Sequence, residues 1–442
     1  MGGHAFALRN KPLFTPRMPL QIYAQILKST LNALQQHFRH VASPIEGPGK
    51  ATFGDVDILV AEPLNPDLDT TQRPTTEVAE ALARVLGAVD RIWQKGNPTI
   101  NLALPWPSSE VSENENPDVT EPAKKYIQVD VHMCPSTTNF TWTLFHAAHG
   151  DLWNILGTTI RPYGLTVNDH GLHLRIPEIE LTNRNKSKIF LTGEPARVLS
   201  FLGLDESRWW TSFGSVNELF EYAAGCRMFR VKLEGEEEDG IGAGDVVGEV
   251  EGQEGGEKGK KKLKHNDRQR MSKRPMFRLW IDEAIPRFRA EGRYSGETVS
   301  REQVREEAFR AFGIRTEYET RLKDHQLSQH LDETWRIAIK STVPVVDVDP
   351  QFRAASVRTL KAVILGGETF DGEVVPAAKT DENGFLDTER VREFVRDHWR
   401  KAGEIGMQQQ EEKARKGMEA KAAKRTRASD DDVDEKMTES LA

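Results

Sequence analysis

Two aspartates one residue apart, Asp55 and Asp57, stand at the start of a hydrophobic run that ends at Val60. This run follows a glycine-containing loop and predicts a buried strand. Side chains at positions i and i+2 of a strand point to the same face, so the two carboxylates are expected to lie side by side. Two ionised carboxylates repel each other and are costly to desolvate without a counter-charge. A divalent cation is the natural counter-charge.

A third carboxylate stands in a second predicted strand. The run from Tyr126 to Met133 alternates apolar and polar residues, which is typical of a half-buried strand, and it carries Asp130. Three carboxylates on two strands provide the oxygen ligands of a site that holds two magnesium ions, with Mn²⁺ as an alternative metal. Such sites carry out phosphoryl transfer.

The loop in front of the first strand has the composition of a phosphate-binding loop. Gly47, Gly49 and Gly54 allow the backbone to approach a phosphate closely, and Lys50 adds positive charge. An Asp-x-Asp pair alone also serves as a turn or a helix cap. The loop and the third carboxylate together favour the metal site over that structural role.

These segments resemble the palm of the DNA polymerase X family, within the polymerase-β-like nucleotidyltransferase superfamily. The resemblance covers about residues 40–225, half of the chain. It rests on four segments in the same order as in the family, namely the carboxylate strand at 54–60, the strand at 128–131, the helix and hairpin at 145–174, and the closing segment at 188–205.

The resemblance implies an α+β fold, in which a palm with a mixed sheet and flanking helices is followed by a mainly helical C-terminal domain. It also implies that Asp55, Asp57 and Asp130 are catalytic and hold both metal ions. The implied nucleotide-binding residues are Gly47, Gly49, Lys50, Gly54, His149, Gly150, Asp151 and Asn154. The implied reaction is transfer of a nucleoside monophosphate from a nucleoside triphosphate to a hydroxyl acceptor, either a nucleic-acid end or a small molecule.

Two departures from the family pattern leave an alternative open. Ala42 and Ser43 stand where the family has Gly-Ser before the carboxylates. Residues 147–150, Ala-Ala-His-Gly, stand where the polymerases place an aromatic residue followed by Thr-Gly-Ser as a sugar gate. The alternative function is that of a catalytically impaired protein with the same fold, which binds nucleotides or nucleic acid without turning them over.

The charge of the chain is segregated. Its 442 residues, 38% hydrophobic and 29% charged, suffice for two domains, and residues 234–257 hold ten acidic side chains and no basic one, whereas residues 258–274 form a basic cluster. We expect a nucleotidyltransferase-like catalytic domain at 1–232, a disordered charged linker at 233–275, a helical domain at 276–403 and a charged disordered tail at 404–442. The basic cluster at 258–274 is either a solvated linker that balances its acidic neighbour, or a nuclear localisation signal or nucleic-acid tether. The basic tail would raise the local affinity for a polyanion.

Hydropathy and cysteine content indicate an intracellular protein of the nucleus or cytoplasm. The two cysteines, Cys134 and Cys226, cannot build a disulfide framework. No apolar run is long enough to span a bilayer, so no membrane partner is expected. Apolar periodicity predicts helices at 18–40 and 75–88, a strand at 100–104, and further helices at 275–292, 300–314, 317–341, 352–365 and 388–402.

Overall fold

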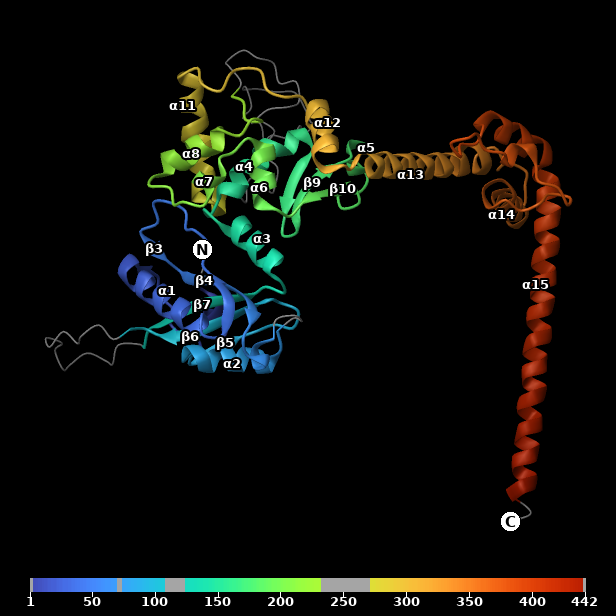
Figure 1. Cartoon of the computed structure of the whole chain (residues 1–442). Coiled ribbons are helices and arrows are strands. Elements are labelled where there is room, and N and C mark those ends of the chain that lie inside the picture. Colours follow the sequence, from blue (N-terminus) through green and yellow to red (C-terminus); the bar gives the residue numbers. More distant parts are fainter. Residues whose placement is uncertain (1–2, 70–73, 108–123, 232–270, 440–442) are drawn as a thin grey trace, which may run out of the picture. The chain divides into compact units, whose positions relative to one another are not determined.

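The computed structural model describes residues 3–69, 74–107, 124–231 and 271–439, without the side chains of Leu8 and of the residues after 421. It is a mixed α+β structure that divides into two compact units, Met1–Thr316 and Glu317–Ala442. The mixed five-stranded sheet belongs to the first unit (Figure 1).

Two parallel neighbours lie near the centre of this sheet. Its order is β2-β4-β7-β6-β5, and only the β4–β7 pair is parallel. The strands are β2(Phe38–Ala42), β4(Asp55–Pro63), β5(Asp90–Ile92), β6(Thr99–Pro105) and β7(Tyr126–Met133). The predicted strands at 56–60, 100–104 and 126–133 are thereby confirmed.

One face of the sheet is covered by the helices α1(Leu20–Leu34) and α2(Thr76–Leu86). Val56, Ile58 and Val131 lie on that face and are fully buried in the core cluster with both helices. Thr75 caps the start of α2, where its side chain accepts a hydrogen bond from the backbone N–H of Val78. Because strand residues alternate between faces, the intervening polar side chains of β4 and β7 point away from this core.

The first predicted helix is too long. The chain leaves the helix after Leu34, and Phe38 begins β2, where it pairs with Pro63 of β4 and is 1% exposed. An apolar residue such as Phe38 fits a buried position in a sheet as well as it fits the apolar stripe of a helix. Periodicity therefore could not separate the two possibilities.

The other face of the sheet is partly covered. Leu59 and Ala61 near the end of β4 pack against Phe140 of α3(Thr137–Ala147).

The remaining elements of this unit up to residue 231 are η1(Ala5–Leu8), β1(Met18–Pro19), β3(Thr52–Phe53), η2(Pro66–Leu68), α4(Leu152–Ile160), η3(Arg161–Tyr163), the hairpin β8(Leu165–Asn168) and β9(Gly171–Arg175), α5(Pro177–Glu180), β10(Lys188–Thr192), α6(Pro195–Leu202), α7(Glu206–Trp209) and α8(Val216–Ala224).

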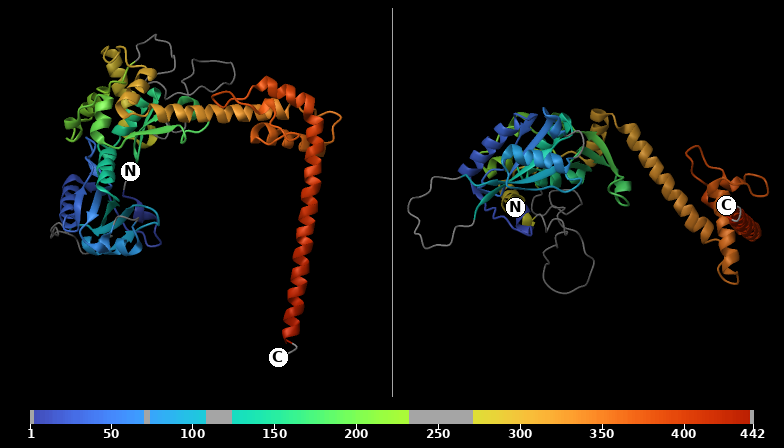
Figure 2. Two further views of the ribbon diagram at one scale, coloured as in Figure 1. Left: turned by 45° about the vertical axis from the view of Figure 1, so that its right-hand side comes forward. Right: turned by 90° about the horizontal axis from the view of Figure 1, so that it is seen from below.

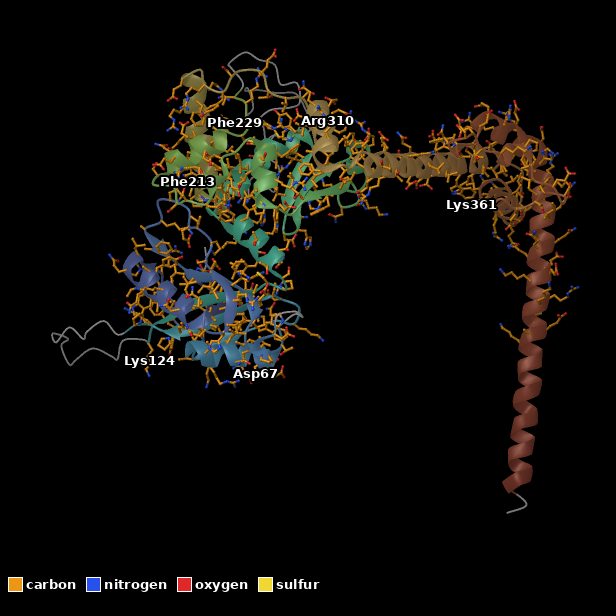
Figure 3. The ribbon with its side chains drawn as sticks, in the orientation of Figure 1. Asp67, Lys124, Phe213, Phe229, Arg310 and Lys361 are labelled. Atoms are coloured by element: carbon orange, nitrogen blue, oxygen red, sulfur yellow. The ribbon has the colours of Figure 1, made fainter. Side chains whose placement is uncertain are left out.

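The helices at 275–312 belong to the first unit, whereas the helical domain was predicted to start at 276. They are α10(Pro275–Leu279), the π-helical turn η4(Trp280–Ala284), α11(Ile285–Ala290) and α12(Arg301–Phe312). Trp280 is 1% exposed, and its ring centre lies 5.4 Å from that of Phe220 and 5.1 Å from that of Phe229. Phe229 is labelled in Figure 3. Burial of these aromatic rings joins the segment to the first unit. Of the predicted linker, residues 233–270 lie outside the described residues.

The second unit is helical. Its elements are α13(Arg315–Glu333), η5(Thr334–Lys340), α14(Pro350–Gly366), η6(Pro376–Ala378) and α15(Thr388–Glu439). Val363, Val391 and Val395 lie in its core. Figure 2 draws α15 as one continuous helix through most of the segment predicted to be a disordered tail. Ion pairs one turn apart, such as Lys416 with Glu412 at 2.7 Å, accompany the helix there.

Because Trp280 is buried against the first unit, cutting the chain near residue 245 with an inserted protease site should not release the C-terminal fragment. We expect both fragments to co-elute in size-exclusion chromatography. Trp280→Ala should destabilise the uncut protein by about 3–5 kcal/mol and promote release. Leu181→Ala, at a side chain that is 89% exposed, is the control. Separate elution of the wild-type fragments would contradict the packing.

Candidate functional site

The three predicted carboxylates share one face of the sheet. In the parallel β4–β7 pair, Asp57 lies opposite Asp130, and Asp55 lies opposite Gln128. Aligned residues of neighbouring strands point to the same side, and Asp55 and Asp57 are two residues apart. The structure therefore brings together side chains that are more than seventy positions apart in sequence.

Two amide side chains hold Asp130. Asn101 of β6 donates from Nδ2 to Asp130 Oδ1 at 2.7 Å. Gln128 donates from Nε2 to both carboxylate oxygens, at 2.9 and 3.0 Å. Burial raises the pKa of Asp130 to about 6, although the hydrogen bonds from Asn101 and Gln128 oppose that shift by favouring the anion.

Asp57 has the most perturbed carboxyl group of the three. Desolvation by the surrounding protein raises its pKa to about 7, and the negative charges of Asp55, Asp130 and Glu46 act in the same direction. Solvent nevertheless reaches the Asp57 side chain, which is exposed, and screens part of this repulsion. The direction of the shift still marks a place where a positive charge would be stabilised.

The predicted phosphate loop carries a carboxylate that the sequence analysis missed. Glu46 forms an ion pair with Lys50, and it accepts a hydrogen bond from the hydroxyl of Tyr23 at 3.0 Å. The Tyr23 ring stacks on Phe53 with the ring centres 3.9 Å apart. Burial and the neighbouring Glu46 raise the pKa of Tyr23. Glu46 and Lys50 lie in a loop, where a four-residue spacing does not by itself indicate contact, so the sequence held no clear signal for this pair.

The loop meets the segment that joins α3 to α4. The backbone N–H of His149 donates to the carbonyl oxygen of Ile45 at 2.6 Å. A Cβ atom on Gly150 would lie 3.9 Å from the Cα atom of Gly47, which is ordinary van der Waals contact. His149 and Gly150 both have positive φ, at 61° and 62°. Two groups of predicted nucleotide-binding residues are therefore neighbours.

The imidazole of His149 lies inside an aromatic cluster. It is fully buried, 5.3 Å from the ring centre of Trp209 and 4.7 Å from that of Phe213. Its Nε2 lies 2.6 Å from the carbonyl oxygen of Trp209 and must donate to it. Burial lowers the pKa of His149, so the ring is neutral. A ring enclosed in this way lies out of reach of a ligand at the surface.

The remaining predicted nucleotide-binding residues are at the start of α4. Asp151 is 8% exposed and accepts a hydrogen bond from Arg274 Nη1 at 3.3 Å, while Asn154 is half-buried. Arg274 comes from the end of the basic segment. The sequence analysis did not connect Arg274 with Asp151, because the two residues are distant along the chain.

The three carboxylates supply the oxygen ligands that Mg²⁺ prefers, and they lie on one face of two adjacent strands. As they stand, however, no three His, Cys, Asp or Glu side chains within the described ranges form a metal-binding group. Both oxygens of Asp130 accept hydrogen bonds. Coordination of an ion would require these side chains to turn toward one another.

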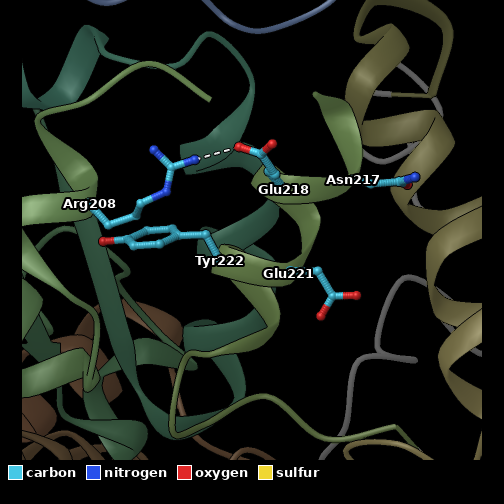
Figure 4. A pocket seen from close by; sticks show the side chains of 5 residues that line it. All are labelled: Arg208, Asn217, Glu218, Glu221 and Tyr222. Atoms are coloured by element: carbon cyan, nitrogen blue, oxygen red, sulfur yellow. Dashed lines mark hydrogen bonds and ion pairs between the residues drawn. The ribbon is translucent and has the colours of Figure 1, made fainter. Parts of the chain in front are cut away.

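A separate pocket of about 450 Å³ lies at α7 and α8 (Figure 4). Its lining residues are Arg208, Asn217, Glu218, Glu221 and Tyr222. Arg208 is paired there with Glu218 at 2.6 Å. None of the three strand carboxylates lines this pocket, so it is distinct from the candidate site.

The raised pKa of Asp57 predicts a pH dependence of stability. Its ordinary value is 3.8 and its folded value is about 7, so the folded chain binds the proton more tightly. This contribution is fully present below about pH 4 and is lost as the pH rises through 7. We expect Asp57→Asn to be more stable than the wild type at pH 8 by about 1 kcal/mol, after solvent screening.

This advantage should shrink as the pH falls toward 4. Urea unfolding in the presence of a chelator measures it. Asp169→Asn, in the exposed turn between β8 and β9, serves as the control. An Asp57→Asn variant that is less stable than the wild type at pH 8 would identify a structural carboxylate instead.

Comparisons of the chain with known proteins leave the site geometry as the basis for assigning a function. No family model matches the chain, and no curated protein matches it.

Within the described ranges, no helix combines the length and the apolar character needed to cross a membrane.

Proposed function

We propose that this chain is a metal-dependent nucleotidyltransferase of the polymerase-β-like superfamily. The observation that carries the proposal is the pairing of Asp57 with Asp130 on adjacent parallel strands, with Asp55 on the same face. The opposite face of the sheet is covered by two helices. This arrangement agrees with the palm that the sequence resembles.

The reaction proposed is in-line transfer of a nucleoside monophosphate from a nucleoside triphosphate to a hydroxyl group. Bound magnesium would neutralise the charge that develops on the phosphate oxygens. Asp55 and Asp57 would hold the metal. Asp130, oriented by Asn101 and Gln128, would complete the ligands of the metal and help to deprotonate the attacking hydroxyl.

The loop around Gly47 and Gly49 would receive the phosphate tail. Lys50 is paired with Glu46 and would exchange this carboxylate for phosphate oxygens when a nucleotide binds. Gly49 has a φ of 76°, which favours glycine and lets the backbone turn tightly there. The neighbouring His149–Gly150 backbone would form the other side of the phosphate site.

The acceptor is a nucleic-acid end or a small hydroxyl compound. The basic segments of the chain would increase its local affinity for a polyanion, which favours a nucleic acid as the acceptor. The alternative function is nucleotide or nucleic-acid binding without turnover. Only the first function requires that the carboxylates be loaded with metal and that product be formed.

The proposal is tested by adding a nucleoside triphosphate and Mg²⁺ to the full chain. Triphosphate at 100 times its Kd should stabilise the protein by about 2.7 kcal/mol when Mg²⁺ is present. Asp57→Asn should abolish both the Mg²⁺-dependent part of this stabilisation and the transfer activity. Asp169→Asn should retain both. Stabilisation of the wild type without any product would support the binding function, and absence of both would refute nucleotide use.

The missing sugar gate predicts weak sugar discrimination. Ala147 and Ala148 replace larger residues of the polymerase pattern, and Ala147 is exposed. A 2′-hydroxyl group should therefore meet little obstruction. We expect ribonucleotides and deoxyribonucleotides to bind within about tenfold of each other, or 1.4 kcal/mol. Competition titrations measure the ratio, and a stronger preference for deoxyribose would require a gate from another residue.

A further inference from the structure

The N-terminal residues Gly3–Phe6 contact both carboxylate strands. The backbone N–H of Ala5 donates to Gln128 Oε1 at 3.0 Å. Gly3 lies against the backbone of Gly54, directly before Asp55: a Cβ atom on Gly3 would lie 2.2 Å from the Gly54 carbonyl oxygen. Gly3 also has a φ of 86°, so only glycine fits there without strain.

This segment is anchored on the protein. Phe6 is fully buried, and the hydroxyl of Thr15 donates to the Gly3 carbonyl oxygen at 2.7 Å. Further along, the backbone N–H of Tyr126 donates to the Phe14 carbonyl oxygen at 2.9 Å, which ties the chain to the first residue of β7. The position of the Ala5 N–H is therefore set by contacts on both sides of it.

Gln128 connects this N–H to Asp130. Gln128 is only 4% exposed, and both the oxygen and the nitrogen of its side-chain amide form hydrogen bonds. The oxygen accepts from Ala5, and the nitrogen donates to both oxygens of Asp130. If the amide were turned over, an NH₂ group would face the Ala5 N–H and an oxygen would face the carboxylate. Both contacts would be repulsive, so Ala5 fixes the orientation that lets Gln128 donate to Asp130.

We propose that Gln128 is a positioning residue for Asp130 and that Gly3–Phe6 is part of the site because it orients Gln128. The inference rests on the proposed metal-dependent function. Asn101 holds one oxygen of Asp130 from β6, whereas Gln128 contacts both. The backbone of Ala5 would therefore affect metal binding without approaching the metal.

The test uses the full chain and compares three variants. Gln128→Leu removes the acceptor for Ala5 and the donors for Asp130. Ala5→Pro removes the backbone N–H at the first position of a short helix. His4 has a ψ of 3°, outside the extended region that a residue before proline prefers, so this substitution also shifts the Gly3–Phe6 segment. The control is Asn10→Pro: the preceding residue Arg9 has the extended backbone (φ −79°, ψ 157°) that a following proline needs, and Asn10 is exposed.

Isothermal titration measures the affinity for Mg²⁺ alone, and melting curves confirm that each variant is folded. We expect Gln128→Leu to weaken Mg²⁺ binding by about tenfold, as loss of a hydrogen-bond partner of a metal ligand does. Ala5→Pro should weaken it by about threefold, less than loss of a direct hydrogen-bond partner of the ligand does, because Asn101 and Gln128 themselves remain. Asn10→Pro should bind as the wild type does. In steady-state kinetics, kcat should fall more than KM for the triphosphate changes.

Folded Gln128→Leu and Ala5→Pro variants with wild-type affinity for Mg²⁺ would overturn the inference and leave the proposed function standing. A wild type that binds no Mg²⁺ would overturn both. If Gln128→Leu does not fold, the result for Ala5→Pro decides between the outcomes, because this variant substitutes none of the side chains of the site.

Discussion

The mutual repulsion of Asp55, Asp57 and Asp130 is the constraint on which the rest of the first unit depends. Adjacent parallel strands hold these carboxylates on one face, and burial raises the pKa of two of them. Such an arrangement costs free energy in the isolated chain. The opposite face compensates, since the buried side chains of β4, β7 and β6 pack there against α1 and α2. Burial of the hydrophobic face therefore offsets the free-energy cost of placing three carboxylates together on the other face.

Groups around the carboxylates divide into those that oppose the repulsion and those that add to it. Asn101 and Gln128 donate hydrogen bonds to Asp130 and favour its ionised form. Glu46 adds negative charge, while Lys50 of the same loop offsets it. His149 takes no part in this balance because its ring is neutral and enclosed by aromatic residues. Negative charge therefore outweighs positive charge around Asp57.

Sequence reasoning located the carboxylates because strand alternation is a local pattern. The run at 126–133 was predicted with its observed bounds. Contacts between distant segments could not be predicted in this way. The hydrogen bond from Asn101 to Asp130 depends on strand pairing, and the packing of Trp280 depends on a chain that returns after residue 270. For His149, a polar residue type concealed a fully buried position.

The parallel pairing of β4 with β7 also has a consequence for folding. Parallel neighbours need a long connection, and here it includes α2, β5 and β6. Closing such a connection costs entropy before any contact between the two strands repays it. We therefore expect the pairing of β4 with β7 to follow formation of the local elements between them. In a chain that lacks this pairing, Asp57 and Asp130 are separated, so the repulsion between them arises only when the two strands pair.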